Sequence, residues 1–156
     1  MSAKFFQTGY SRRQKRLYQR VMSGIEFNRV RGRCLRFLTL TSSLESEPSK
    51  FHQNFRKLVK RIRRKFGWFE YIAVPELTKK GLIHLHLIFA GSFMEQKWIS
   101  RIWKLLNHAK IVFIERVRGG SRRLGGYLCK YLEKNPQGRF WWSWNWVYRG
   151  FVADWN

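Results

Sequence analysis

Acidic residues are scarce in this chain of 156 residues. Nine Asp and Glu face 32 Lys and Arg, which leaves a formal net charge of +23. So large an excess repels itself in a folded domain unless a polyanion is nearby. Nucleic acid is the partner that this balance predicts. An anionic membrane surface is the alternative, but no long amphipathic basic helix with a clean apolar face dominates the chain.

Cysteine and long apolar runs are also scarce. The two cysteines, Cys34 and Cys129, make neither a CxxC pair nor a disulfide framework, so we expect free thiols in a reducing compartment. No apolar stretch has the length of a signal peptide or of a membrane span. We therefore expect an intracellular protein, acting in a prokaryotic cytoplasm or a host nucleus, that is neither secreted nor bound to a membrane.

The length and the order of apolar patterns predict an α+β fold. Residues 1–34 form a basic N-terminal segment, with a helix possible from Ser11, and residues 35–156 form the predicted domain. Strands are predicted over 34–43, 68–77, 82–90 and 109–117, and helices over 49–67, 94–108 and within 118–138. This order predicts a ferredoxin-like or RRM-like antiparallel sheet of about five strands. We expect helices on one face and an open face for a site.

The run "GLIHLHLIFAG" (residues 81–91) carries two histidines in an otherwise apolar strand. Because side chains alternate between the faces of a sheet, His84 and His86 point away from the core face and are neighbours. Two neutral imidazoles at that separation can bind one divalent ion. Paired surface histidines that bind nothing are the alternative.

Glu76 is the candidate third ligand. It lies eight residues before His84, at the end of the preceding strand. It shares the histidine face only if the residue numbers of paired residues in the two strands add up to an even number. Glu76 opposite Leu82, around a three-residue loop, is one such pairing. A His-His-carboxylate set suits Mn²⁺ or Mg²⁺, which could then hold a phosphate oxygen.

The run "GGYLCKYLEK" (residues 125–134) predicts an amphipathic helix with two tyrosines. Its buried stripe is Leu124, Leu128 and Leu132, and a second stripe runs through Tyr127, Lys130, Tyr131 and Lys134. A tyrosine is a poor nucleophile at neutral pH, so attack needs a nearby Lys and a metal that polarises the target phosphate. Two half-buried packing residues are the alternative.

Taken together, "FLTLTSS", "HLHLIF" and "YLCKYLEK" resemble the three motifs of the HUH superfamily of single-strand endonucleases, in the family's order, over roughly residues 35–135. Rolling-circle replication initiators (Rep proteins) are the members that the chain most resembles. The resemblance implies the HUH endonuclease fold and a metal held by His84, His86 and Glu76.

The resemblance also implies the chemistry. Tyr127 would attack a DNA phosphodiester, leaving a free 3′-OH and a 5′-phosphotyrosine link, with Lys130 assisting. Both tyrosines fit the YxxK pattern, and some relatives use two tyrosines four residues apart, so a catalytic role for Tyr131 stays open. On the predicted helix Tyr131 lies close to the apolar centre and Tyr127 lies further round toward the lysines, which favours Tyr127 as the first nucleophile.

The implied partners are an origin hairpin or loop of single-stranded DNA and a host or viral helicase and polymerase. The chain has no GxxxxGK[ST] loop, so we expect a helicase to be supplied by another protein. "RVRGGSRR" (residues 116–123) is expected to line the DNA path. Five aromatics of one parity predict a C-terminal strand: Phe140, Trp142, Trp144, Trp146 and Tyr148. These rings could stack on unpaired bases or pack on the domain or on a second subunit, and the size of the patch favours packing.

Three functions remain open from the sequence. The first is a metal-dependent nickase and strand-transferase that starts rolling-circle replication. The second is a transposase or relaxase with the same chemistry. The third is a basic single-strand-binding module without catalysis.

Overall fold

Five antiparallel strands form the centre of the protein, in the order β4-β1-β3-β2-β5. The computed structural model describes residues 9–109, 112–134 and 139–147. The strands are β1 (Leu35–Thr41), β2 (Phe69–Leu77), β3 (Ile83–Gly91), β4 (Val112–Arg116) and the short β5 (Trp141–Trp142). The predicted α+β fold, an antiparallel sheet with helices packed on it, is confirmed.

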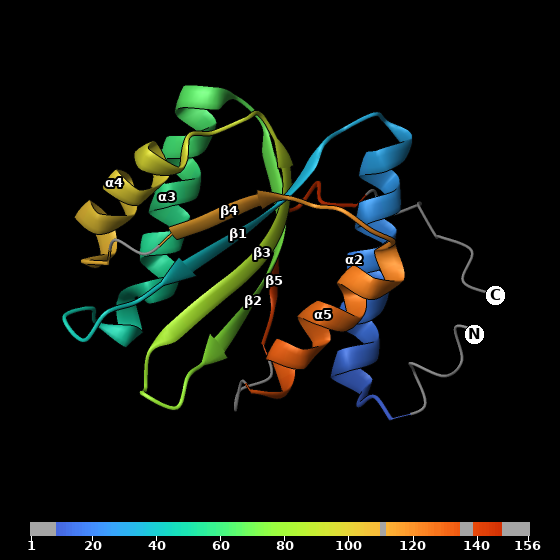
Figure 1. Cartoon of the computed structure of the whole chain (residues 1–156), viewed down its shortest axis with the longest axis horizontal. Helices are drawn as coiled ribbons and strands as arrows, with labels where there is room; N and C mark the ends of the chain where they lie inside the picture. The colour runs from blue at the N-terminus through green and yellow to red at the C-terminus, as the bar shows by residue number, and fades with distance from the viewer. Residues whose placement is uncertain (1–8, 110–111, 135–138, 148–156) are drawn as a thin grey trace.

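Helices cover both faces of this sheet (Figure 1). One face carries α3 (Phe51–Phe66), preceded by the 3₁₀ turn η1 (Pro48–Lys50), and α4 (Gln96–Asn107). The other face carries α2 (Arg12–Val30) and α5 (Ser121–Glu133). Among the described helices, none is long and apolar enough to cross a bilayer.

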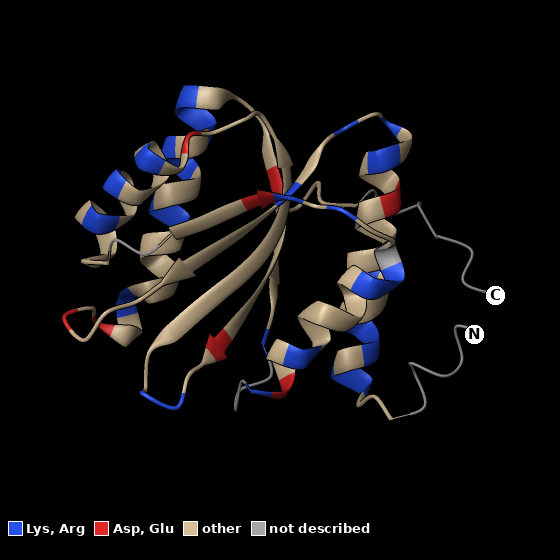
Figure 2. Cartoon of the chain, in the orientation of Figure 1, with Lys and Arg blue, Asp and Glu red and all other residues tan. Residues whose placement is uncertain are grey.

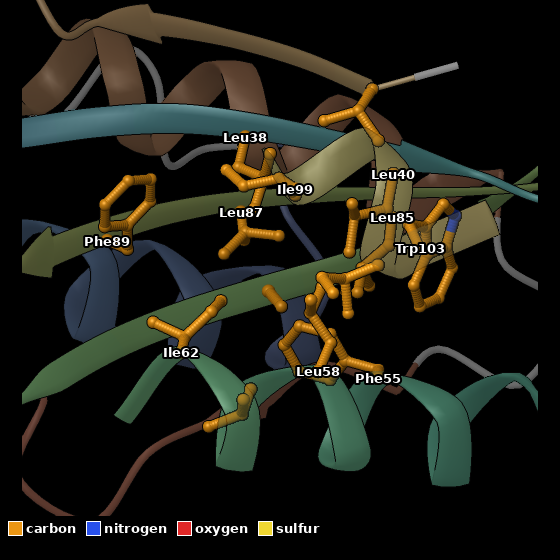
Figure 3. Close-up of a cluster of buried hydrophobic side chains, with 14 of the residues drawn as sticks. Leu38, Leu40, Phe55, Leu58, Ile62, Leu85, Leu87, Phe89, Ile99 and Trp103 are labelled. Carbon is orange, nitrogen blue, oxygen red and sulfur yellow. The ribbon is translucent and has the colours of Figure 1, made fainter. Parts of the chain in front are cut away.

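The core on the α3–α4 side follows directly from the strand alternation. Leu85, Leu87 and Phe89 of β3 all point to this side and are fully buried. They meet the apolar stripe of α3, where Phe55, Leu58 and Ile62 recur at helical spacing (Figure 3). Trp103 of α4 and the leucines of β1 complete the cluster, whose labelled members are Leu38, Leu40, Phe55, Leu58, Ile62, Leu85, Leu87, Phe89, Ile99 and Trp103.

The expectation of an open second face is wrong for most of its area. Ile72, Val74 and Ile88 lie on this face and are fully buried beneath α2 and α5. Alternate residues of a strand reach opposite faces, so each central strand supplies two cores. The end of this face near the β2–β3 connection carries Glu76, His84 and His86, and the candidate site lies there.

The basic N-terminal segment contains a well-defined helix. Ser11 caps α2: its hydroxyl accepts from the Gln14 amide, and the Gln14 side chain accepts from the Ser11 amide. The helix buries Leu17, Val21 and Ile25 against the sheet and α5. The boundary at residue 34 stays a prediction, but α2 shares a hydrophobic cluster with the domain that follows.

The aromatic tail does not form the predicted long strand. Of the described residues of the tail, Trp141 and Trp142 alone pair with β2, and a turn follows. Trp146 is fully buried, whereas Trp144 is 76% exposed; Tyr148 lies outside the described residues. The Trp146 ring packs directly on Gly24 of α2, where any side chain would overlap it. A turn brings this ring to the helix, and the alternation of aromatic residues in the sequence did not predict this turn.

Candidate functional site

The β2–β3 hairpin brings Glu76 and the two histidines to one face of the sheet. Glu76 pairs directly with His84, and His86 lies two residues further along on the same side. The even pairing that the site requires is therefore confirmed. The specific example, with Leu82 opposite Glu76 around a three-residue loop, is wrong, because residues 78–82 form a longer connection.

The carboxylate of Glu76 lies between the two imidazoles. Its Oε2 atom is 2.7 Å from His86 Nε2 and 4.0 Å from His84 Nδ1. One ligand atom from each of the three residues lies within 4.8 Å of the others, so this cluster could hold a metal ion. The predicted ligand set is thus brought together in space.

Burial favours the neutral form of His86 in this cluster. The side chains of His86 and Glu76 are about one tenth exposed, and that of His84 about one third. Burial lowers the pKa of His86 below its ordinary value, and this outweighs the hydrogen bond with Glu76, which favours the charged form. A neutral imidazole keeps the lone pair that a metal requires.

The donor set fits a hard or borderline divalent ion. Two imidazole nitrogens and one carboxylate oxygen are ligands that Mn²⁺ accepts, and Mg²⁺ tolerates them less readily because it prefers oxygen. Three protein ligands leave further coordination positions for water or for a phosphate oxygen of a substrate.

Helix α5 ends beside this cluster. Its apolar stripe, Leu124, Leu128 and Leu132, is buried as predicted. The amide of Leu77, at the end of β2, donates to the carbonyl of Lys134 immediately after α5, at 3.3 Å. This bond fixes the end of the helix against the hairpin that carries the metal ligands.

The two tyrosines of α5 connect the helix to the metal ligands. The Tyr131 ring is stacked on the His86 ring, with centroids 3.6 Å apart and an interplanar angle of 16°. The Tyr131 hydroxyl donates to the Tyr127 hydroxyl oxygen at 2.7 Å. Burial raises the pKa of Tyr131 well above its ordinary value, and the bond to Tyr127 adds to this rise. Tyr131 is therefore a protonated donor, and Tyr127, which is 42% exposed, is the acceptor.

Two lysines flank the tyrosines in different ways. Lys130 is exposed and lines the same cavity as Tyr127. Lys134 places Nζ 3.7 Å from Glu76 Oε1, so it contacts the metal cluster itself. Helical spacing put Lys134 on the tyrosine stripe but did not give it a role in the site. Its position three residues after Tyr131 was the signal that could have found it.

A large basic cavity opens next to Tyr127. Its volume is about 1160 Å³, and α2, α5 and the β4–α5 connection contribute to its lining. Arg116, Arg118, Arg122 and Arg123 of the predicted DNA path all line it, together with Lys130. Two carboxylates, Glu115 and Glu133, also line it, but the Arg and Lys side chains outnumber them.

The cavity has two contributors that sequence reasoning missed. Phe37 of β1 lines the cavity and holds the Tyr127 ring edge-on, with centroids 5.6 Å apart. Gln14 of α2 donates to Glu133 of α5 at 2.8 Å and so joins the two helices at the rim. Both contributions depend on the packing of α2 and α5, which the sequence pattern did not predict.

The fold of the chain is similar to that of a solved structure. In fold, the chain is similar to the crystal structure of the hypothetical protein ORF119 from Sulfolobus islandicus rod-shaped virus 1, with a TM-score of 0.53 and 14% identity. The similarity covers 77% of this chain and 96% of that one and shows the fold alone. No curated protein sequence matches the chain.

The sequence does match the replication-associated protein family named for ORF2 over residues 35–136. The match covers more than half of the chain and includes every predicted site residue. The chain therefore belongs to this ORF2 family of replication-associated proteins.

Proposed function

We propose that this protein initiates replication by nicking single-stranded origin DNA through a tyrosine nucleophile and later rejoins the strands. Membership of a replication-associated family connects it with replication initiation. The observation that supports the nicking chemistry is the unbroken contact from Tyr127 through Tyr131 to His86 and Glu76. A helix face that served only for packing would not require these polar contacts with the metal ligands.

The proposed reaction is a transesterification. The Tyr127 hydroxyl oxygen forms a bond to phosphorus and loses its proton, while the bond from phosphorus to the 3′ oxygen breaks. The 3′ oxygen takes up a proton and becomes the 3′-OH that a polymerase extends. The 5′ side of the DNA stays linked to the protein as a phosphotyrosine, and attack by a 3′-OH reverses the step and rejoins the strand.

Residues around Tyr127 favour this step. The hydrogen bond from Tyr131 stabilises negative charge on the Tyr127 oxygen as its proton leaves. Lys130 adds positive charge along the same cavity. A divalent ion held by Glu76, His84 and His86 would withdraw charge from a phosphate oxygen.

The basic cavity supports single-stranded DNA as the substrate. Arginines that contact phosphates supply affinity without sequence preference, and that affinity falls steeply with salt. Because these arginines and Tyr127 line one cavity, a strand bound there would pass the nucleophile.

A covalent-adduct assay tests the proposal. The protein is incubated with a pool of single-stranded oligonucleotides and Mn²⁺, with and without EDTA, and separated on a denaturing gel. We expect a metal-dependent protein–DNA band that Tyr127→Phe and His86→Ala abolish. Tyr71→Phe, which removes a hydroxyl from β2 on the α3–α4 side of the sheet, is the matched control and should leave the band unchanged.

Two outcomes would contradict the proposal in different ways. Loss of the band with Tyr131→Phe alone would assign the nucleophile to the second tyrosine. The absence of any band, with tight and salt-sensitive DNA binding retained, would instead indicate a binding module without catalysis.

A further inference from the structure

A second surface combines exposed aromatic rings with cations, at the opposite end of the β2–β3 ladder from the metal ligands. It is formed where α3 ends at Gly67 and where β3 leads into α4. Trp68 is 46% exposed and Phe93 is 68% exposed, although both are large and apolar. Phe69, the residue after Trp68, pairs with Gly91, so the two segments lie side by side.

The strand register separates this surface from the nicking site. Phe69 pairs with Gly91 at one end of the β2–β3 ladder, and Glu76 pairs with His84 at the other. Seven residue steps of about 3.3 Å place the two ends about 23 Å apart. The rings at this end therefore lie far from the metal ligands.

Each exposed ring has a cation beside it. The Arg33 guanidinium lies 4.5 Å from the centre of the Trp68 ring. The Arg36 guanidinium lies 5.7 Å from the centre of the Phe93 ring. Lys65 Nζ lies 5.1 Å from the centre of the half-buried Trp98 ring, which lines a cavity of about 550 Å³ together with Phe93. Lys97 and Arg101 also line this cavity, against one carboxylate, Glu95.

The charge of this surface continues along the outer side of α3 and α4. Helix α3 carries seven Lys and Arg and no acidic residue. Figure 2 shows Lys and Arg spread over the outer sides of both helices, on the far side of the sheet from α2 and α5. The nicking site does not use this charge, so the basic excess has a second location.

We propose that this aromatic–basic surface, formed by Trp68, Phe93, Trp98, Lys65, Lys97 and Arg101, binds unpaired DNA away from the nick. Unpaired bases stack on exposed aromatic rings, and neighbouring cations hold the phosphates on either side of each base. A duplex would present the same phosphates but no free base faces. Only the identity of the partner as DNA rests on the proposed function; the surface and its chemistry are independent of it.

The test compares single-stranded and duplex DNA without catalysis. Fluorescent oligonucleotides of one sequence, single-stranded or as a duplex, are titrated with the protein in EDTA, and fluorescence anisotropy gives the affinity. The double variant Trp68→Ala/Phe93→Ala is expected to bind the single strand about 5- to 150-fold more weakly for each base that no longer stacks. Its affinity for the duplex should change little. Leu105→Ala is the matched control, because Leu105 is an equally exposed apolar residue of α4 at 67%.

A second variant changes charge alone. Replacing Lys65, Lys97 and Arg101 by Gln should lower the slope of log affinity against log salt, by about 0.7 for each phosphate of a single strand that the variant can no longer neutralise. Retained single-strand affinity and an unchanged slope in both variants would overturn the proposal and indicate a surface for another kind of partner. An equal loss for single strand and duplex in the double variant would overturn base stacking.

This result can be separated from the proposed function. Because binding is measured in EDTA, it does not depend on any adduct. At saturating DNA the double variant should still form whatever adduct the unmodified protein forms. A protein that forms no adduct but loses single-strand affinity in the double variant would refute the nickase and support the second surface.

Discussion

Replacing Glu76 by Gln is expected to remove most of the stabilisation that a divalent ion gives this protein. The two side chains are nearly the same size, so packing at the end of β2 should persist. The charge is what changes. The Glu76 carboxylate is 2.7 Å from His86 Nε2 and within 4.0 Å of His84 and Lys134 atoms. Without this charge, the two imidazoles are left as the ligands of the cluster.

The size of the effect follows from mass action. An ion at a hundred times its Kd stabilises a folded protein by about 2.7 kcal/mol. For a domain of this length, about 1 kcal/mol shifts Tm by about 2–4 °C, so Mn²⁺ should raise Tm by about 5–11 °C. A hundredfold loss of affinity would leave about 0.4 kcal/mol, a shift of about 1–2 °C.

Thermal unfolding measured by circular dichroism, after EDTA treatment and then over an Mn²⁺ titration, checks this prediction. Glu115→Gln is the matched control, because Glu115 is an exposed acid at the end of β4 on the same sheet. No DNA is present, so the readout does not depend on nicking. An unchanged Mn²⁺ shift in Glu76→Gln, or an equal loss in Glu115→Gln, would refute the assigned metal site.

Three further outcomes are expected. Gly24→Ala should lower the free energy of unfolding by about 1–3 kcal/mol in urea titrations, because the added methyl overlaps the buried Trp146 ring. Tyr131→Phe should slow adduct formation about 2- to 13-fold on quenched time courses without abolishing it, because it removes one hydrogen bond to the nucleophile and keeps the ring. Burial raises the pKa of the Cys129 thiol to about 12, so at neutral pH alkylation followed by mass spectrometry should label the half-buried Cys34 and leave Cys129 unmodified until the protein unfolds.

The strand pattern predicted most of the site because side chains alternate between only two faces of a sheet, so few arrangements are possible. His84 and His86 had to share a face, and Glu76 could join them only with an even pairing sum. The structure has such a pairing. Helical periodicity likewise placed Tyr127 and Tyr131 next to the buried leucine stripe of α5.

The packing of α2 was less accessible from the sequence. Its apolar residues Leu17, Val21 and Ile25 recur at helical spacing, yet they alternate with a strongly basic outer face. The charge describes only the outer face of this helix, whereas the apolar stripe determines which side is buried. This helix covers the second face together with α5, and both helices line the basic cavity.

Contacts between elements far apart in the sequence could not be derived from spacing. The pairing of Lys134 with Glu76 depends on where α5 ends relative to β2. The burial of Trp146 depends on a turn after β5 and on a glycine in α2. Neither leaves a periodic signal in the sequence.

Mass-spectrometric mapping of the residue linked to DNA tests the central claim most directly. Trypsin cleaves after Lys and Arg, so residues 124–130 and residues 131–134 form separate peptides, each with one tyrosine. After incubation with single-stranded DNA and Mn²⁺, followed by nuclease digestion, nucleotide mass should appear on the peptide that carries Tyr127. Nucleotide mass on the peptide that carries Tyr131 alone, or on neither peptide despite tight DNA binding, would contradict the account.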